Sequence, residues 1–248
     1  MPVNPALVAA VTAAGLVTGW VLRPVVFRYA APAGEPPRGA CPACGDPVAA
    51  AHRLPWPPAS PFARCPACRA HIGPPPLAVE LITAALFGAL AARVHPGLVL
   101  AAACWLAACA VPLAWIDAAV QRLPDVLTAP AYAGTAIFLL LAAAAGRPWG
   151  DLVRAVLGGL ALAAVYLAIT VVSRSGLGLG DVKLAASLGT LLAWAGWRTL
   201  LAGTFAGFLL GAVYGAALLF SRRATRSQRI PFGPFMIAGA FLALLLYA

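Results

Sequence analysis

The stretch GLVLAAACWLAACAVPLAWID, residues 97–117, decides the fold class, because it is apolar along its whole length until it ends on the carboxylate of Asp117. An α-helix needs about 20 such residues to cross the hydrocarbon core of a bilayer. The whole chain is 62% hydrophobic and only 10% charged, whereas soluble domains are about one quarter charged. The sequence therefore predicts an all-α integral membrane protein.

Eight apolar runs of this kind, bounded by Pro, Gly, Arg or Asp, predict a polytopic protein of about eight transmembrane helices. The expected helices are residues 4–23, 77–94, 97–117, 126–145, 151–173, 181–195, 198–220 and 231–247. Because only Gly196 separates the sixth run from the seventh, a count of seven is the alternative. The first run lacks a basic segment before it and a clear cleavage site, so we interpret it as a retained helix rather than a signal peptide.

Lysine and arginine are distributed unevenly among the loops. The loops after the first, third, fifth and seventh expected helices contain 13 of the 17 basic residues, and the other side contains four. The positive-inside rule places the basic loops, with Asp117 and Asp181, in the cytoplasm. The net charge of +10 is then a topology signal rather than a nucleic-acid site, because no aromatic and basic face accompanies it.

The first cytoplasmic loop, residues 24–76, is rich in Pro, Gly and Arg and cannot build a core from apolar burial alone. Two Cys-x-x-Cys pairs, Cys41 with Cys44 and Cys65 with Cys68, match the spacing of a structural zinc site. Two disulfides are the alternative, which a reducing cytosol disfavours. Because four cysteines close the coordination shell, the zinc is expected to be structural rather than catalytic.

Other metal-ligating side chains have simpler interpretations. His52 and His71 could each replace a cysteine in the zinc site, but we expect solvated loop residues because four cysteines complete the shell. Cys104 and Cys109 lie within an apolar run and are expected to be small core residues.

Asp117 and Asp181 remain as candidates for chemistry, because ionisable groups near membrane depth are costly unless they function or are paired. Two aspartates can hydrolyse a peptide bond when one carboxylate deprotonates water and the other, protonated, hydrogen-bonds the scissile carbonyl. A helix dipole at the expected start of residues 181–195 favours Asp181 as the ionised member and Asp117 as the acid. Asp125 and Asp151, in contrast, are predicted to be N-caps.

Several motifs resemble one known family. Gly178-Leu179-Gly180-Asp181 is similar to the GxGD signature of intramembrane aspartyl proteases, and Trp115-Ile116-Asp117 resembles the first catalytic motif of bacterial type IV prepilin peptidases, also called leader peptidases and N-methyltransferases. Residues 79–84, VELITA, and Pro231-Phe232-Gly233-Pro234 resemble the family segments that open the second and last helices. The paired cysteine knuckles also lie in the loop that the family uses.

Position by position, the resemblance places the catalytic aspartates on Asp117 and Asp181. It implies an aspartic endopeptidase domain at residues 77–248, after a first transmembrane helix at 1–23 and a cytoplasmic zinc-binding domain at 24–76. It also implies cleavage of the leader from type IV prepilins or type II secretion pseudopilins at the cytoplasmic face of a bacterial inner membrane. Bifunctional members then methylate the new N-terminus from S-adenosylmethionine.

Five residues are expected to support this site: Gly178, Gly180, Lys183, Glu80 and Gly233. The glycines before Asp181 allow close approach of a partner. Lys183 is interpreted as tuning Asp181 or binding lipid phosphate. Glu80 is interpreted as contacting the leader, supporting the zinc module or forming an ion pair with a loop arginine.

The chain departs from the family at the end of its first run. Family members commonly have Gly-Ser-Phe-Leu-Asn-Val followed by Arg-Leu-Pro, whereas residues 18–24 read TGWVLRP and lack the asparagine. Since methylation is attributed to the amino-terminal half, the departure concerns methyl transfer more than proteolysis.

Two functions of other classes are weighed against the peptidase. A proton-coupled transporter would relay protons through buried carboxylates, but it would be expected to contain a repeat of broken helices, and the sequence contains no convincing one. A zinc-stapled scaffold of a secretion or pilus complex would not need two carboxylates at membrane depth. The sequence leaves open the natural prepilin and the oligomeric state.

Overall fold

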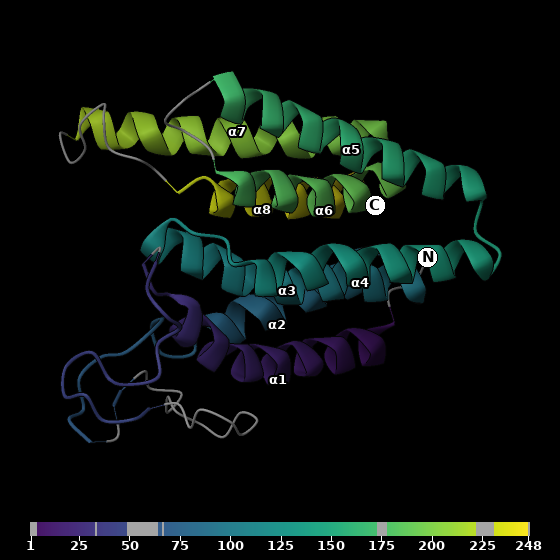
Figure 1. The fold of residues 1–248 in the computed structure, drawn as a ribbon. Helices are drawn as coiled ribbons and strands as arrows, with labels where there is room; N and C mark the ends of the chain where they lie inside the picture. Colours follow the sequence, from purple (N-terminus) through teal and green to yellow (C-terminus); the bar gives the residue numbers. More distant parts are fainter. Residues whose placement is uncertain are drawn as a thin grey trace. The chain divides into compact units, whose positions relative to one another are not determined.

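The structure, a computed structural model, describes residues 4–32, 34–48, 64–65, 67–172, 178–221 and 231–247. This part of the chain forms eight helices and no strand beyond two isolated bridges, so the all-α prediction is confirmed (Figure 1). The helices are α1 (Pro5–Tyr29), α2 (Ala78–Arg93), α3 (Leu98–Val120), α4 (Asp125–Ala144), α5 (Trp149–Val172), α6 (Leu179–Ala195), α7 (Trp197–Phe220) and α8 (Gly233–Tyr247).

The helices have the length and composition of membrane spans. Five of them, α1, α3, α4, α5 and α7, are long and apolar enough to cross a bilayer. The apolar side chains of Leu201, Phe205 and Val213 on α7 are each at least 60% exposed, as expected for a surface that contacts lipid rather than water. The protein is therefore a multi-pass membrane protein. Gly196 separates α6 from α7, so the described chain has the larger of the two expected helix counts.

The chain forms two compact units. Unit 1 contains residues 1–92 and 107–122, and unit 2 contains residues 93–106 and 123–248. Helix α3 contributes its first half to unit 2 and its second half to unit 1.

Glycines allow the helices of unit 2 to pack closely. A Cβ added to Gly189 on α6 would lie 3.0 Å from the carbonyl oxygen of Gly158 on α5, and one added to Gly239 on α8 would meet the backbone of Gly207 on α7. Such contacts between small residues are typical of helix packing in membranes, where burial from water contributes little. Backbone contact thus fixes α6 against α5 and α8 against α7.

Polar contacts identify the two ends of the α6 helix. At its start, Lys183 pairs with Asp125 in the first turn of α4. At its other end, Arg154 near the start of α5 donates to the carbonyl oxygens of Ala193 and Trp194. The start of α4 therefore lies beside the start of α6, and the start of α5 lies beside its end.

Helix α1 of unit 1 is longer than expected and ends at Tyr29 rather than near Arg23. Pro24 lies inside the helix, and Arg23 is buried because Glu80 neutralises its charge. The additional turn carries Phe27, which is 2% exposed and packs with Cys41, Cys65 and other residues in the core of the cysteine module. A polar residue at the end of an apolar run therefore did not mark the end of the helix.

Candidate active site and metal centre

Asp181 lies in the first turn of α6, where its Oδ2 accepts a hydrogen bond of 2.8 Å from the N–H of Gly178. Its Oδ1 is buried and has no hydrogen-bond partner in the described part of the chain. Gly180 faces the segment before α4, and a Cβ there would lie 2.8 Å from Cβ of Leu123. The two predicted glycines thus serve different purposes: Gly178 orients the carboxylate, and Gly180 permits close packing.

Asp117 lies in the last turn of α3, in unit 1, and is only 5% exposed. Its backbone carbonyl accepts a hydrogen bond of 2.8 Å from Gln121, whose positive φ of 52° follows the end of the helix. Leu113 and Ile116 are fully buried beside it. A charged carboxylate in these surroundings is costly unless it is paired or has a function.

Lys183 pairs with Asp125, at 2.6 Å, and not with Asp181. The prediction that Asp125 is an N-cap is wrong, because α4 begins at Asp125 and its N-cap, Pro124, makes no side-chain cap bond. The same prediction fails for Asp151, which lies two residues inside α5 and pairs with Arg154 at 2.9 Å. In both cases a first-turn carboxylate is already favoured by the helix dipole and also has a cation within reach.

Tyr166 is a residue of this region that the sequence did not reveal. It is 2% exposed on α5, and its ring lies 5.6 Å from that of Phe208 and 6.1 Å from that of Phe232. Asp181 interacts electrostatically with its phenol. The predicted supporting residue Gly233 follows Phe232 and is buried at the start of α8. In the sequence, Tyr166 could not be distinguished from an ordinary apolar span residue.

The two cysteine pairs form matching knuckles in unit 1. In each, the N–H of the first cysteine donates to the carbonyl five residues later, over 2.8 Å for Cys41 and 2.9 Å for Cys65. The residue after the second cysteine has positive φ in both, 75° at Gly45 and 58° at Arg69. Each knuckle therefore directs its two thiols to the same side of a tight turn.

The four thiols fit a tetrahedral metal. Their sulfur atoms lie within 4.8 Å of one another, with 3.7 Å between Cys41 and Cys68 and 3.8 Å between Cys44 and Cys65. A zinc tetrahedron with bonds of about 2.3 Å has sulfur edges of about 3.8 Å. No disulfide joins these four cysteines in the structure, which favours the metal site over the disulfide alternative. His71 is exposed and outside the group, and His52 lies outside the described residues.

The electrostatics of the thiols also favour a cation. The backbone N–H of Ala43 makes the largest contribution in lowering the pKa of Cys41 to about 7. At Cys44 the backbone N–H of Asp46 lowers the pKa, but the thiol of Cys68 and burial raise it, to about 12 in all. Neighbouring thiolates repel one another, and a bound zinc would supply the charge that allows all four to ionise.

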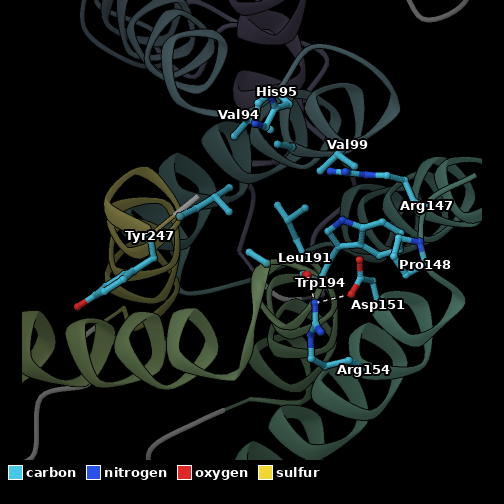
Figure 2. A pocket seen from close by; sticks show the side chains of 13 residues that line it. Val94, His95, Val99, Arg147, Pro148, Asp151, Arg154, Leu191, Trp194 and Tyr247 are labelled. Carbon is cyan, nitrogen blue, oxygen red and sulfur yellow. Dashed lines mark hydrogen bonds and ion pairs between the residues drawn. The ribbon is translucent and has the colours of Figure 1, made fainter. Parts of the chain in front are cut away.

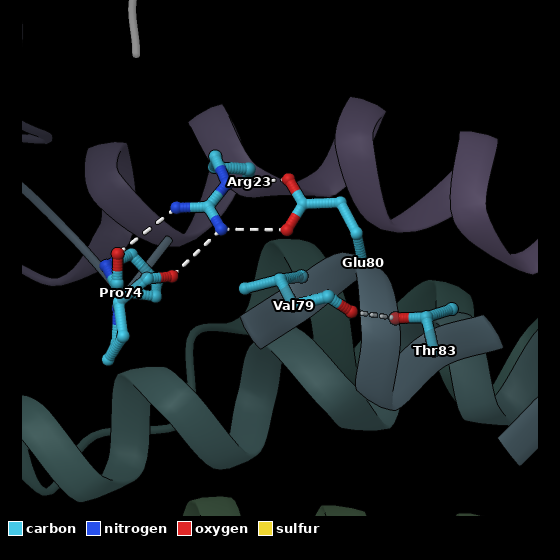
Figure 3. Close-up of polar contacts among 6 residues, drawn as sticks. Arg23, Pro74, Val79, Glu80 and Thr83 are labelled. Atoms are coloured by element: carbon cyan, nitrogen blue, oxygen red, sulfur yellow. Dashed lines mark hydrogen bonds and ion pairs between the residues drawn. The ribbon is translucent and has the colours of Figure 1, made fainter. Parts of the chain in front are cut away.

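Glu80 forms a buried ion pair with Arg23 from α1 rather than with a loop arginine (Figure 3). Nε and Nη2 of Arg23 donate to the two carboxylate oxygens over 2.6 and 2.7 Å. The same guanidinium donates to the carbonyl oxygens of Pro74 and Pro75, over 3.0 and 2.9 Å. Arg23 thus joins α1, α2 and the segment that returns from the cysteine knuckles.

Comparisons with known proteins agree with these motifs. Residues 100–216 match the type IV leader peptidase family. Three similar relatives are each named prepilin leader peptidase/N-methyltransferase. The protein of Aeromonas salmonicida is 36% identical over 84% of this chain and 71% of its own length, that of Pseudomonas aeruginosa 35% over 84% and 71%, and that of Bacillus subtilis 32% over 84% and 82%. No solved structure matches the chain.

Proposed function

The chain belongs to the type IV leader peptidase family, and we propose that it is a prepilin peptidase in which Asp117 and Asp181 form the catalytic pair. The observation that supports the pair best is the hydrogen bonding of the two carboxylate oxygens of Asp181. One carboxylate oxygen is fixed by the N–H of Gly178, while the other is buried without a hydrogen-bond partner in the described chain. A buried acceptor in this state is suited to bind the attacking water or a shared proton.

In the proposed reaction, the Asp181 carboxylate removes a proton from water, which then attacks the scissile carbonyl. Asp117, protonated, hydrogen-bonds that carbonyl and later donates its proton to the departing amine. The hydrogen bond from Gly178 and the helix dipole stabilise negative charge on Asp181, whereas the burial of its Oδ1 opposes that charge. The assignment of Asp181 as the base is therefore supported by the way Gly178 orients its carboxylate rather than by its charge state.

The proposed substrates are type IV prepilins and type II secretion pseudopilins whose apolar segment is still in the membrane. The positive-inside rule supports an active site at the cytoplasmic face of a bacterial inner membrane. A basic leader there would meet the carboxylates, while its apolar stem packs beside the helices in lipid.

The cysteine knuckles are proposed to bind one structural zinc through Cys41, Cys44, Cys65 and Cys68. A second activity, methylation of the new N-terminus from S-adenosylmethionine, is supported by the double name of the relatives. The mass of the mature N-terminal peptide tests it, because methylation adds the mass of one methyl group.

Co-expression with a prepilin tests the proteolytic proposal. Asp117→Asn and Asp181→Asn should each abolish leader removal, because neither remaining aspartate can act as both acid and base. Asp151→Asn is the matched control, since this carboxylate lies two residues inside α5 and pairs with Arg154. Normal processing by either Asp117→Asn or Asp181→Asn would refute the catalytic pair.

A further inference from the structure

A pocket of about 320 Å³ lies in unit 2 where α6 and α8 end and α5 begins (Figure 2). Its apolar wall includes Val99, Leu191 and Leu244, and its polar lining includes His95 and Arg147. The proposed peptidase mechanism uses none of these residues. The pocket thus combines an apolar wall with cationic side chains, a combination that an enclosed core cavity would lack.

The pocket lies far from Asp181 within unit 2. Asp181 is in the first turn of α6, and the pocket is lined by Leu191, Trp194 and Ala195 near the other end of that helix, about 15–20 Å away at the rise of an α-helix. Trp149, Trp197 and Tyr247, at the ends of α5, α7 and α8, are 59%, 48% and 57% exposed. Exposed aromatic residues at helix ends mark the boundary between lipid and water. The pocket therefore opens at the membrane interface opposite the Asp181 end.

Two polar side chains of the pocket, an arginine and a histidine, are available to a ligand. Arg154 is already occupied, because it donates to the carbonyl oxygens of Ala193 and Trp194 and pairs with Asp151. His95 and Arg147 are exposed, and in the part of the chain that the structure describes no hydrogen bond or ion pair engages the Arg147 guanidinium. In Figure 2 the Arg147 side chain extends toward Val99. Because Arg154 neutralises the charge of Asp151, the remaining net charge of the pocket lining is positive.

We propose that this pocket binds the headgroup of an anionic phospholipid. Arg147 and His95 would contact the phosphate, and the acyl chains would lie against Leu191, Leu244 and Val99. An arginine guanidinium matches the geometry of phosphate oxygens and can bind two of them at once. A free phosphate would leave the apolar wall unused, so the lining favours the lipid. Because the ligand contacts the start of α3 and the ends of α6 and α8 together, it stabilises the folded state of unit 2.

Thermal unfolding of the purified full chain in detergent, with added phosphatidylglycerol, phosphatidylcholine or inorganic phosphate, tests the proposal. Phosphatidylglycerol should raise the unfolding temperature, and the other two should not. Arg147→Gln should weaken the response to phosphatidylglycerol roughly tenfold in lipid concentration, because a charge-assisted contact is lost. Arg198→Gln is the matched control, since Arg198 lies at the start of α7, at the same end of the helices, but does not line the pocket.

Two sets of outcomes would overturn the proposal. An equal response to all three additives, or to inorganic phosphate alone, would show that no anionic lipid is recognised. An unchanged response in both Arg147→Gln and His95→Gln would show that the lipid binds elsewhere. The unfolding temperatures of these variants without added lipid should equal that of the parent chain, which separates lost binding from lost folding.

Discussion

Arg23 and Glu80 have opposite charges at positions where neither could remain unpaired. Their side chains are 1% and 5% exposed, and two parallel hydrogen bonds join them. Gly19 makes this contact possible, because a Cβ there would lie 2.9 Å from the backbone oxygen of Val79, next to Glu80. The ion pair therefore fixes the position of α1 along the axis of α2.

Removing one partner of this pair should be much more harmful than removing both. Arg23→Met leaves the Glu80 carboxylate buried and unpaired, which should lower the free energy of unfolding by about 3–5 kcal/mol. The double variant Arg23→Met, Glu80→Met should recover most of that loss. Equilibrium unfolding in mixed micelles measures both, and additive losses would contradict the pairing.

At the residue scale, the sequence predicts which charged side chains need a partner more accurately than it predicts which residue that partner is. Glu80 was recognised as a costly charge, but its partner lies 57 positions away on another helix, and no local pattern reports such a pairing. The sequence interprets Lys183 as tuning Asp181 or binding lipid phosphate, whereas the fold pairs it with Asp125. Partner choice depends on which helix ends meet, and that is decided by packing.

The helices themselves were largely predictable, because each apolar run is long and bounded by breakers. Helix α4 was expected at residues 126–145 and spans Asp125–Ala144. Helix α1 was expected to end at residue 23, but it continues past Pro24 to Tyr29. The Arg23–Glu80 ion pair and the packing of Phe27 against the cysteine module stabilise this additional turn. Hydropathy reports lipid exposure, and it does not detect a charge neutralised inside the protein.

At the scale of helix pairs, the close packing of α7 and α8 depends on glycine. Gly239→Ala should lower stability by about 1–3 kcal/mol, because the added methyl group would meet the backbone of Gly207. Gly150→Ala is the matched control, since nothing lies within 4 Å of its added Cβ, and a neutral or slightly positive effect is expected. Thermal unfolding compares the two. If both substitutions changed the unfolding temperature equally, the close packing of α7 and α8 at Gly239 would not contribute to stability.

At the scale of the whole molecule, a loop module with four clustered cysteines is attached to a membrane protein, and we propose that a metal stabilises it. Its described core is small, with Phe27, Cys41, Val48, Cys65 and Ile72 as buried members. The sequence predicts that the four cysteines cluster, because Cys-x-x-Cys spacing is a local pattern typical of zinc sites, and the structure brings the four thiols together. The division of α3 between two compact units was not predictable, because it depends on contacts rather than composition.

Metal removal should therefore destabilise this module. The purified chain should contain one zinc, which Cys41→Ser loses and Cys104→Ser retains, because Cys104 lies in the apolar helix α3. Loss of zinc should lower the unfolding temperature of the chain. Metal analysis and thermal unfolding measure both effects, and a zinc-free parent chain of unchanged stability would rule out the structural zinc.

The central proposal is that Asp117 and Asp181 act on one peptide bond. The most direct test introduces Asp117→Cys and Asp181→Cys into a chain with Cys104→Ala and Cys109→Ala, followed by a short thiol crosslinker and peptide mapping. The account predicts a crosslink between positions 117 and 181. It predicts none in the control with Asp117→Cys and Asp151→Cys, because the start of α5 lies beside the opposite end of α6. A crosslink in the control, with none between 117 and 181, would contradict it.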